Sequence, residues 1–543
     1  MTAVAPYRSQ YQSPGVPGRD GFAQALRAEW TKFRTVRGWV IGTLVAALVM
    51  AGVGLLAAGG GRSACQAVGV GANGQPESGS GSSCQPSFIL GPDGEPVADS
   101  FYFVRQPLTG DGSVTVRVTS MTGLLPPDHP DNAAGPFDSV HGVEPWAKAG
   151  LIVKENLSQG SAYAAILVAA DHGVRLQWNY TGDTAGLPGP VGPANPRWLR
   201  LTRSGDVITG YDSADGAHWT RVGAVTLTGL SSTAQVGLFT ASPDHDQMTA
   251  NFGGGVSGGG GPTRDTAVFD HLATADGWTA GPWTGQYVGR PEIPGVVGFH
   301  QAGGQYTLTG QGNIAPVPAG HGGPADASAT VTDYLLGTFV GLIALVVVAG
   351  LFVTAEYRRG LIRLTFAATP SRGRVLAAKS VVVAVAGFVA GLVGAAAAVL
   401  AGEAITRARG YYAFPISGTA EARVIVGTAV LTAVASVLAL AIGAIVRRGA
   451  ATVAVVIVVI VVPYFLAMTA ALPLGTGDWL LRIAPAAGFA LQQPYPAYDQ
   501  VTMLYSPFSG YFPLAPLAGL GVLAAWTAAA LALAAYRLRR RDA

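Results

Sequence analysis

The residue types that could bind or hydrolyse a nucleotide are not spaced for that task. The chain has four lysines, at positions 32, 148, 154 and 379, and none of them follows a glycine. A phosphate-binding P-loop needs a Gly-Lys-Ser/Thr sequence, because its backbone amides and its lysine hold the phosphates. The sequence therefore predicts that the chain does not hydrolyse ATP at a site of this kind.

Other motif matches occur in unsuitable surroundings. A GxGxxG match at 69–74 has no strand before it and no helix after it, and a GxSxG match at 255–259 lies in a glycine run. Glu144 and Glu155 are the only glutamates in the strand-rich region and form no clustered acidic motif. The nearest approach to a metal-ligand group lies along a Pro-rich loop without a recognised spacing: Asp128, His129, Asp131 and His141. We expect no catalytic residue, metal site or cofactor.

One basic segment, 352–379, lies between two apolar runs and reads FVTAEYRRGLIRLTFAATPSRGRVLAAK. Gly360 interrupts the helix that leaves the membrane, and Pro370 ends the apolar stretch beyond that glycine. Between these breaks, the apolar residues predict a short helix over 361–368. Basic residues beside a membrane span are explained by topology alone, but that explanation does not require an apolar surface.

Six apolar runs determine the fold class. Each has 20 to 23 residues without a charge, close to the roughly 20 that cross a bilayer as helix. They are 39–58, 334–355, 380–402, 424–446, 450–472 and 514–535. Only 12% of the residues are Asp, Glu, Lys or Arg, and the mean hydropathy is +0.36. We predict a polytopic membrane protein with six transmembrane α-helices, and we expect 333–543 to be a five-span region.

Flanking charges predict the orientation. Eighteen Lys and Arg residues flank the spans on one side, while the short loops of the other side hold four. Because basic residues stay in the cytoplasm, both termini are expected there, in a multi-pass protein of the cell membrane. The segment 59–332 then lies outside, with 12 basic and 22 acidic residues. Basic residues concentrated beside the bilayer do not favour nucleic acid as a partner.

The external segment predicts an all-β domain. Its linker, 59–87, is rich in Gly and Ser and contains Cys65 and Cys84, for which we expect a disulfide in an oxidising compartment. From 88 to 252, short alternating runs separated by Gly, Asp and Pro predict a β-sandwich. The segment 253–332 is expected to be a Gly-rich linker with a small β unit, or the returning edge of the sandwich. Tryptophans of this domain fill its core or stack on a sugar.

The N-terminal segment precedes the first span. Residues 1–20 have the composition of a disordered tail. Over 21–38, an apolar stripe accompanied by basic residues predicts an amphipathic helix at the membrane interface. The stripe consists of Phe22, Leu26, Trp30 and Phe33. The alternative is a helical extension of the first span.

These features resemble bacterial ABC-2 type transporter permeases. The resemblance rests on LRAEWTKFRTVRG before the first span and on EYRRG…TPSRGRVLAAK between the second and third. It implies an ATP-binding partner subunit, a permease dimer and a coupling helix that the ATPase contacts. The positions that match are Glu356, Tyr357, Arg358, Arg359, Gly360, Pro370, Arg374 and Lys379. Leu361, Arg363 and Phe366 of the short helix are expected to share the contact.

The inserted external domain departs from the simplest members of that family. It is similar to concanavalin-like, laminin-G-type sandwiches in KAGLIVKE, YDSADGAHWT and VGLFTAS. The leading hypothesis is the permease subunit of an ABC-2 type transporter, with export implied by the resemblance alone. The alternative is a membrane-anchored protein that binds a glycan or another ligand, or senses it, through the sandwich.

Overall fold

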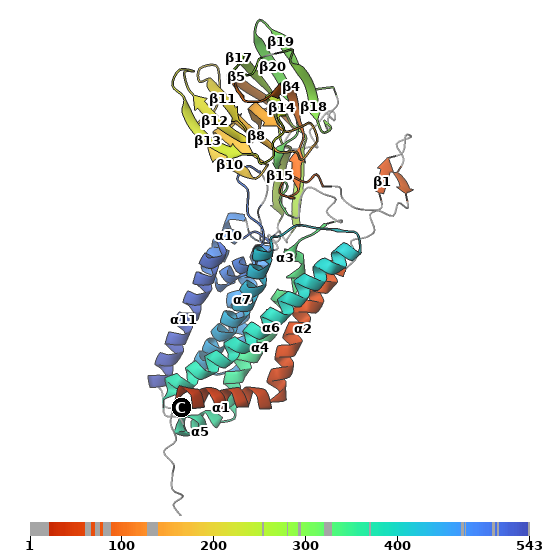
Figure 1. Ribbon diagram of the computed structural model, residues 1–543. Coiled ribbons are helices and arrows are strands. Elements are labelled where there is room, and N and C mark those ends of the chain that lie inside the picture. Colours follow the sequence, from red (N-terminus) through yellow and green to blue (C-terminus); the bar gives the residue numbers. More distant parts are fainter. Residues whose placement is uncertain are drawn as a thin grey trace, which may run out of the picture.

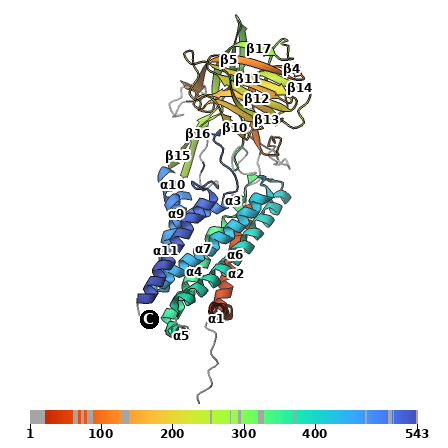
Figure 2. The same ribbon diagram turned by 60° about the vertical axis from the view of Figure 1, so that its left-hand side comes forward.

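The computed structural model describes the chain in several stretches. They are residues 21–59, 67–70, 76–79, 88–126, 139–251, 255–279, 281–291, 295–319, 328–368, 371–468, 472, 474–501, 505, 507 and 510–540. A helical bundle carries a β-sandwich at one end (Figures 1 and 2). The opposite end carries helices α1 (Phe22–Thr35) and α5 (Leu361–Ala368), and we call it the α1–α5 end.

Six helices of the described chain are long and apolar enough to cross a membrane, which indicates a multi-pass membrane protein. They are α2 (Arg37–Gly59), α3–α4 (Val331–Tyr334 and Gly337–Arg358), α6 (Arg372–Ala408), α7 (Gly418–Val446), the fifth span, and α11 (Pro516–Arg540). The fifth span consists of α8 (Gly449–Val456), a π-helical turn η2 (Ile457–Val461) and α9 (Val462–Met468). Pro463 comes after the π turn, and because proline lacks an N–H it disturbs regular α-helical bonding there.

Glycines bring the spans into close contact within the chain. A Cβ on Gly337 would lie 2.1 Å from the carbonyl oxygen of Met50, and one on Gly391 would lie 2.1 Å from Oγ1 of Thr432. The first contact joins α4 to α2, and the second joins α6 to α7. Small residues at such crossings let backbones approach, so these glycines serve packing inside one copy.

The loop after the fifth span folds into two helices, α10 (Leu474–Ile483) and the 3₁₀ helix η3 (Pro485–Gln492). The sequence predicts a short helix here, at or dipping into the outer leaflet. Trp479 of α10 is exposed, as expected for such a helix. All of η3 is buried, however, and packs against α7 and α11, so it is covered by protein.

Two antiparallel sheets form the sandwich. The seven-stranded sheet runs β10 (Gly182–Ala185), β9 (Gly173–Trp178), β8 (Tyr163–Ala169), β7 (Lys148–Lys154), β14 (Thr233–Ala241), β4 (Phe101–Thr109), β18 (Thr284–Val288). The eight-stranded sheet runs β13 (Thr220–Thr226), β12 (Val207–Ser213), β11 (Arg197–Ser204), β5 (Gly112–Leu125), β17 (Arg264–Ala275), β20 (Gln305–Gly310), β19 (Gly298–Ala302), with β6 (Val140–His141) beside β5.

Along the strands, side chains that face the core alternate with side chains that face away from it, and this explains how the two sheets pack. Val114, Val116 and Val118 of β5 point into a core that both sheets share. β7 and β8 are buried at every position, because a second apolar cluster covers their outer face. Two short strands beside this cluster, β3 (Val97–Asp99) and β21 (Ile314–Pro316), pair with each other.

The predicted boundary of the sandwich at residue 252 is wrong. β17, β19 and β20 extend the eight-stranded sheet, and β18 forms an edge of the seven-stranded one. Of the two alternatives for 253–332, a small β unit or the returning edge of the sandwich, the structure has the second. In the expected glycine linker, β16 (Gly255–Gly261) pairs with β15 (His245–Asn251). The pairing of β17 with β5 joins residues far apart in sequence, so local patterns do not reveal it.

Several contacts join the sandwich side of the chain to the bundle. Ser328 and Ala329 (β22) pair in parallel with Tyr412 and Ala413 (β23), after α6. The ring of Phe88 lies 4.4 Å from that of Tyr412. The side-chain amide of Gln500, in the last loop, donates a hydrogen bond to the carbonyl of Tyr180. In the linker before the sandwich, β1 (Ala67–Val70) pairs with β2 (Pro76–Gly79).

Candidate functional site

The turn between α4 and α5 is built by one glycine. Gly360 has a φ of +67°, in the left-handed region that side chains disfavour. α4 ends immediately before it at Arg358, with Arg359 as its C-terminal cap, and α5 begins immediately after it at Leu361. The left-handed residue redirects the chain, so a separate short helix comes after the span. The helix predicted over 361–368 is present with those bounds.

α5 has one buried and one exposed apolar face. Ile362 is buried, and Phe366 is partly buried against the core of the bundle. The guanidinium of Arg372 lies 5.4 Å from the centre of the Phe366 ring and so holds this end of α5 against α6. Leu361 is 43% exposed and Leu364 is 69% exposed. An isolated exposed leucine is ordinary, but this pair gives a short solvent-facing helix an apolar surface.

A cluster of four charged residues lies behind α5, and we call it the ion cluster. Nζ of Lys379, on α6, lies 2.6 Å from Oε2 of Glu29 on α1 and 2.7 Å from Oε1 of Glu356 on α4. Nζ of Lys32 lies 2.8 Å from Oε1 of Glu29 and 3.2 Å from Oε1 of Glu356. Two lysines and two glutamates thus alternate across three helices.

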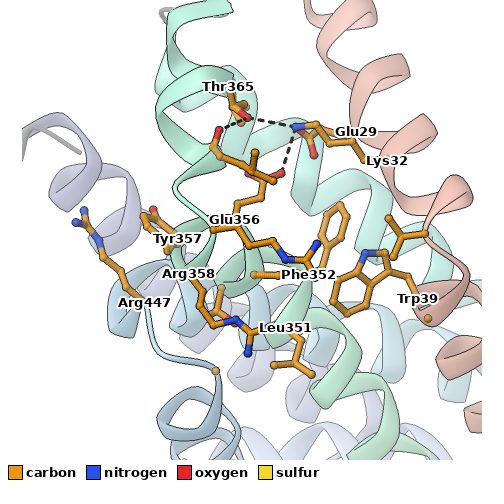
Figure 3. Close-up of a pocket in the computed structure, with 18 of the residues that line it drawn as sticks. Glu29, Lys32, Trp39, Leu351, Phe352, Glu356, Tyr357, Arg358, Thr365 and Arg447 are labelled. Atoms are coloured by element: carbon orange, nitrogen blue, oxygen red, sulfur yellow. Dashed lines mark hydrogen bonds and ion pairs between the residues drawn. The ribbon is translucent and has the colours of Figure 1, made fainter.

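The ion cluster also reaches α5. Lys32 Nζ donates a hydrogen bond of 3.4 Å to the hydroxyl of Thr365, and Figure 3 shows this bond beside those to the glutamates. Glu29 and Lys379 are 3% and 2% exposed, whereas the side chain of Lys32 is 40% exposed. The cluster is therefore closed toward the bundle and open toward solvent at Lys32.

The electrostatics of Lys32 result from these contacts. Partial burial alone would lower the pKa of Lys32. Hydrogen bonds and charges from Glu29 and Glu356 outweigh burial and raise the pKa above its ordinary value of 10.5. The lysine therefore stays protonated near neutral pH and balances the second carboxylate of the cluster.

A cavity of about 1080 Å³ opens beside the ion cluster, between α1, α4, α5 and the starts of α2 and α8; we call it the α1–α4 cavity. Trp39, Leu351 and Phe352 form apolar walls (Figure 3). Basic side chains also line it: Lys32, Arg358, Arg359, Arg447 and Arg448. The guanidinium of Arg447 lies 5.1 Å from the centre of the Tyr357 ring. The cavity thus joins an apolar wall to a basic rim.

α1 is a helix of its own rather than an extension of the first span. Val36 caps it in an extended conformation, and α2 begins at Arg37 in a new direction (Figure 1). Phe33 is buried and Leu26 is partly buried, both against the bundle core. Phe22 and Trp30, also of the predicted stripe, remain exposed. The stripe is therefore divided between the protein and the surroundings.

The structure brings several predicted residues together but gives them different positions. Arg358 and Arg359 are exposed at the cavity, and Arg374 is exposed near the start of α6. Glu356 and Lys379, however, are buried in the ion cluster and offer little surface to a partner. Their side chains hold α1, α4 and α6 together.

Sequence reasoning missed Glu29, Lys32 and Thr365. A usable signal was present, because Glu29 is the only acidic residue of α1, on a helix that carries several basic ones. A single acid among basic residues on one helix favours an ion pair with a lysine or arginine. Its partner Lys379 lies 350 positions away, and only the folded chain reveals the pairing.

Some predicted residues lie outside the described residues. These are Cys65 and Cys84, Pro370, the side chain of Arg363, and Asp128, His129 and Asp131 of the suggested metal-ligand group. Within the described residues, no group of three or more His, Cys, Asp or Glu could hold a metal ion. His141, the remaining member, is exposed on β6.

Comparisons with known proteins add no assignment. No family model matches the chain, and no curated protein matches it either. Among solved structures, a protein of unknown function from Saccharomyces cerevisiae is 15% identical, with a TM-score of 0.20, over 33% of this chain and 75% of that one. A scytalido-glutamic peptidase is 9% identical, with a TM-score of 0.23, over 39% of this chain and 98% of its own. At these TM-scores, the likenesses carry no argument about this chain.

Proposed function

We propose that the protein is the membrane-spanning permease subunit of an ABC-2 type transporter, powered by an ATPase on a separate chain. Its α1–α5 end faces the cytoplasm in this proposal, and the sandwich, of concanavalin-like type, lies outside the cell membrane. Two copies form the transport unit, and the direction is export. α5 is the coupling helix that the ATPase contacts.

The observation that carries the proposal is the position of α5. Its exposed leucines lie at one end of the bundle, and Thr365 on the same helix contacts the ion cluster that joins α1, α4 and α6. A push on α5 would therefore reach three helices through a few short contacts. Basic residues before α2, between α4 and α6, after α7 and at the end of α11 gather at this end, as the positive-inside rule requires of a cytoplasmic face.

Co-purification tests the proposal. The full chain, extracted in mild detergent from its own cells, is expected to bring with it a nucleotide-binding ATPase subunit. Leu364→Arg and Arg359→Glu place a mismatched charge on the proposed contact, and each is expected to reduce the recovered ATPase at least tenfold. Both side chains are exposed, so folding is retained. Arg539→Glu, on α11 at the same end, is the matched control and should leave recovery unchanged.

Two outcomes would reject the proposal. A wild-type complex without any nucleotide-binding subunit would favour the binding or sensory role of the sandwich. Equal losses from Arg359→Glu and Arg539→Glu would show a general charge effect instead of a contact at α5.

A further inference from the structure

The α1–α4 cavity has more positive charge than its own acids neutralise. Lys32 and Lys379 are matched by Glu29 and Glu356 within the ion cluster. Arg358, Arg359, Arg447 and Arg448 remain around the cavity. No ion pair joins Arg358, Arg359 or Arg448 to an acid within the described part of the chain. The rim is therefore suited to an anion.

The inner part of the cavity is apolar and extends along the spans. Trp39 lies in the first turn of α2, and Leu351 and Phe352 lie about two turns before the end of α4. Leu351 is exposed toward the cavity, whereas Phe352 is packed against Trp39 with ring centres 6.0 Å apart. A free phosphate would leave this wall uncovered. A water-soluble protein would have to enter the depth of the membrane to cover it.

We propose that the α1–α4 cavity binds an anionic phospholipid from the leaflet at this end. Arg358, Arg359 and Arg448 hold the phosphate-bearing headgroup, and an acyl chain covers Trp39 and Leu351. A guanidinium presents paired N–H donors to phosphate oxygens, so arginines suit this headgroup. Basic pockets between spans at the membrane surface have the charge that anionic headgroups require.

The volume supports this occupant. At about 1080 Å³, the cavity is slightly larger than most small-molecule sites and accommodates a headgroup with part of a chain. The bound lipid would lie between α1 and the α4–α5 turn, beside Lys32 of the ion cluster. The inference depends on the membrane placement of the bundle and not on an ATPase partner. Arg359 belongs to both proposals, but Arg448 belongs to this one alone, so its variant lets the two proposals fail separately.

Tryptophan quenching by brominated lipids tests the proposal. The full chain is reconstituted in two kinds of phosphatidylcholine vesicle. One contains a fraction of brominated phosphatidylglycerol, and the other contains the same fraction of brominated phosphatidylcholine. The chain has ten tryptophans, so the contribution of Trp39 is obtained by subtracting the Trp39→Phe variant. Trp526, exposed on α11, serves as the internal reference through Trp526→Phe. We expect brominated phosphatidylglycerol to quench Trp39 more strongly than brominated phosphatidylcholine, and Trp526 equally.

Charge variants identify the rim. Arg358→Gln, Arg359→Gln and Arg448→Gln are each expected to weaken the preference for phosphatidylglycerol on the order of fivefold. All three side chains are exposed, so the variants should fold. Arg537→Gln, Arg539→Gln and Arg540→Gln remove the same charge from the end of α11, outside the cavity lining, and should keep the preference.

Three results would overturn the proposal. Equal quenching of Trp39 by the two lipids would show no anionic selectivity. A preference abolished by glycerol phosphate at a similar concentration would show a phosphate site without a lipid. Protection of Trp39 from both lipids by a bound ATPase subunit, with no preference in its absence, would show that a protein occupies the cavity.

Discussion

The described part of the chain contains a buried lysine–carboxylate cluster in the sandwich and another in the bundle. In the sandwich, Nζ of Lys154 lies 2.8 Å from Oδ2 of Asp99, and the Tyr180 hydroxyl donates a 2.7 Å hydrogen bond to the same oxygen. Both charged side chains are fully buried. In the bundle, Lys379 is almost as deeply buried, but the cluster continues through Lys32 to solvent.

The difference separates a fixed structural pair from one that can respond. Asp99, Lys154 and Tyr180 hold β3, β7 and the turn after β9 together inside a closed domain. The ion cluster instead joins α1, α4 and α6 and touches an exposed eight-residue helix. Similar chemistry therefore serves closure in one region and communication in the other, if α5 is a contact site as proposed.

The substitution Asp99→Asn is the strongest test of the difference between the two clusters. The substitution leaves Lys154 buried without its counter-charge, where burial already lowers the lysine pKa despite Asp99. We expect a loss of about 3–5 kcal/mol in the unfolding free energy of the sandwich. Denaturant unfolding of the full chain in detergent, followed by near-UV circular dichroism, measures it. Asp93→Asn, an exposed control, should stay within about 0.5 kcal/mol. A loss below about 1 kcal/mol would show that Lys154 does not depend on Asp99.

The corresponding change in the bundle is Lys379→Met. It leaves Glu29 and Glu356 facing only Lys32, and solvent admitted at Lys32 reduces the cost. We therefore expect a loss of about 2–3 kcal/mol, smaller than in the sandwich. Protease cleavage between α1 and α2 should also become faster, because α1 loses its main polar anchor. Lys32→Met should cost no more than about 1 kcal/mol, since that side chain is partly exposed. Equal effects of the two substitutions would contradict the geometry of the cluster.

A pH experiment sharpens the comparison through Lys148, a third buried lysine. Burial lowers its pKa to about 7, and its amine donates a 2.5 Å hydrogen bond to the carbonyl of Ile314. Between about pH 7 and its unfolded value near 10.5, the unfolded chain binds the proton and the folded chain does not. Folding stability should therefore rise with pH across this window, by about 1.4 kcal/mol per unit.

Lys148→Met should remove this slope. The difference in unfolding free energy between variant and wild type, measured at several pH values across the window, tests the assignment. Lys32 provides the opposite sign, because its raised pKa gives stability that is complete below 10.5 and lost as the pH rises beyond it. A pH-independent difference for Lys148→Met would mean that Lys148 remains protonated in the folded domain.

The sequence alone predicts the features that depend on residues close together in the chain. Hydropathy over about 20 residues identified the six long helices, because crossing the bilayer constrains every residue in turn. Gly360 indicates the start of α5 for a similarly local reason, its left-handed backbone. The alternating runs of β5 and β11 indicate strands because one face of each is buried.

The sequence alone does not predict the features that depend on contacts between distant segments of the chain. The expected end of the sandwich is wrong because β17 pairs with β5, far earlier in the chain, across a glycine-rich segment that is typical of a linker. Glu356 and Lys379 are expected at the surface because charge is usually exposed, and their burial depends on Glu29 from a third helix. The α1–α4 cavity combines residues from six helices and has no signature in any one of them.

The contact between α2 and α4 has a further consequence for chain length. Gly337 and Gly341 press against Met50, so the two helices that flank the inserted domain lie side by side. Everything between Gly59 and Val331 is then a loop with adjacent ends. The entropy of closing a loop grows only with the logarithm of its length, and a tenfold change amounts to about 2 kcal/mol. The entropic cost of closing this loop is therefore only slightly larger for a whole domain than for a short turn. Domains of many kinds can for this reason occupy the position.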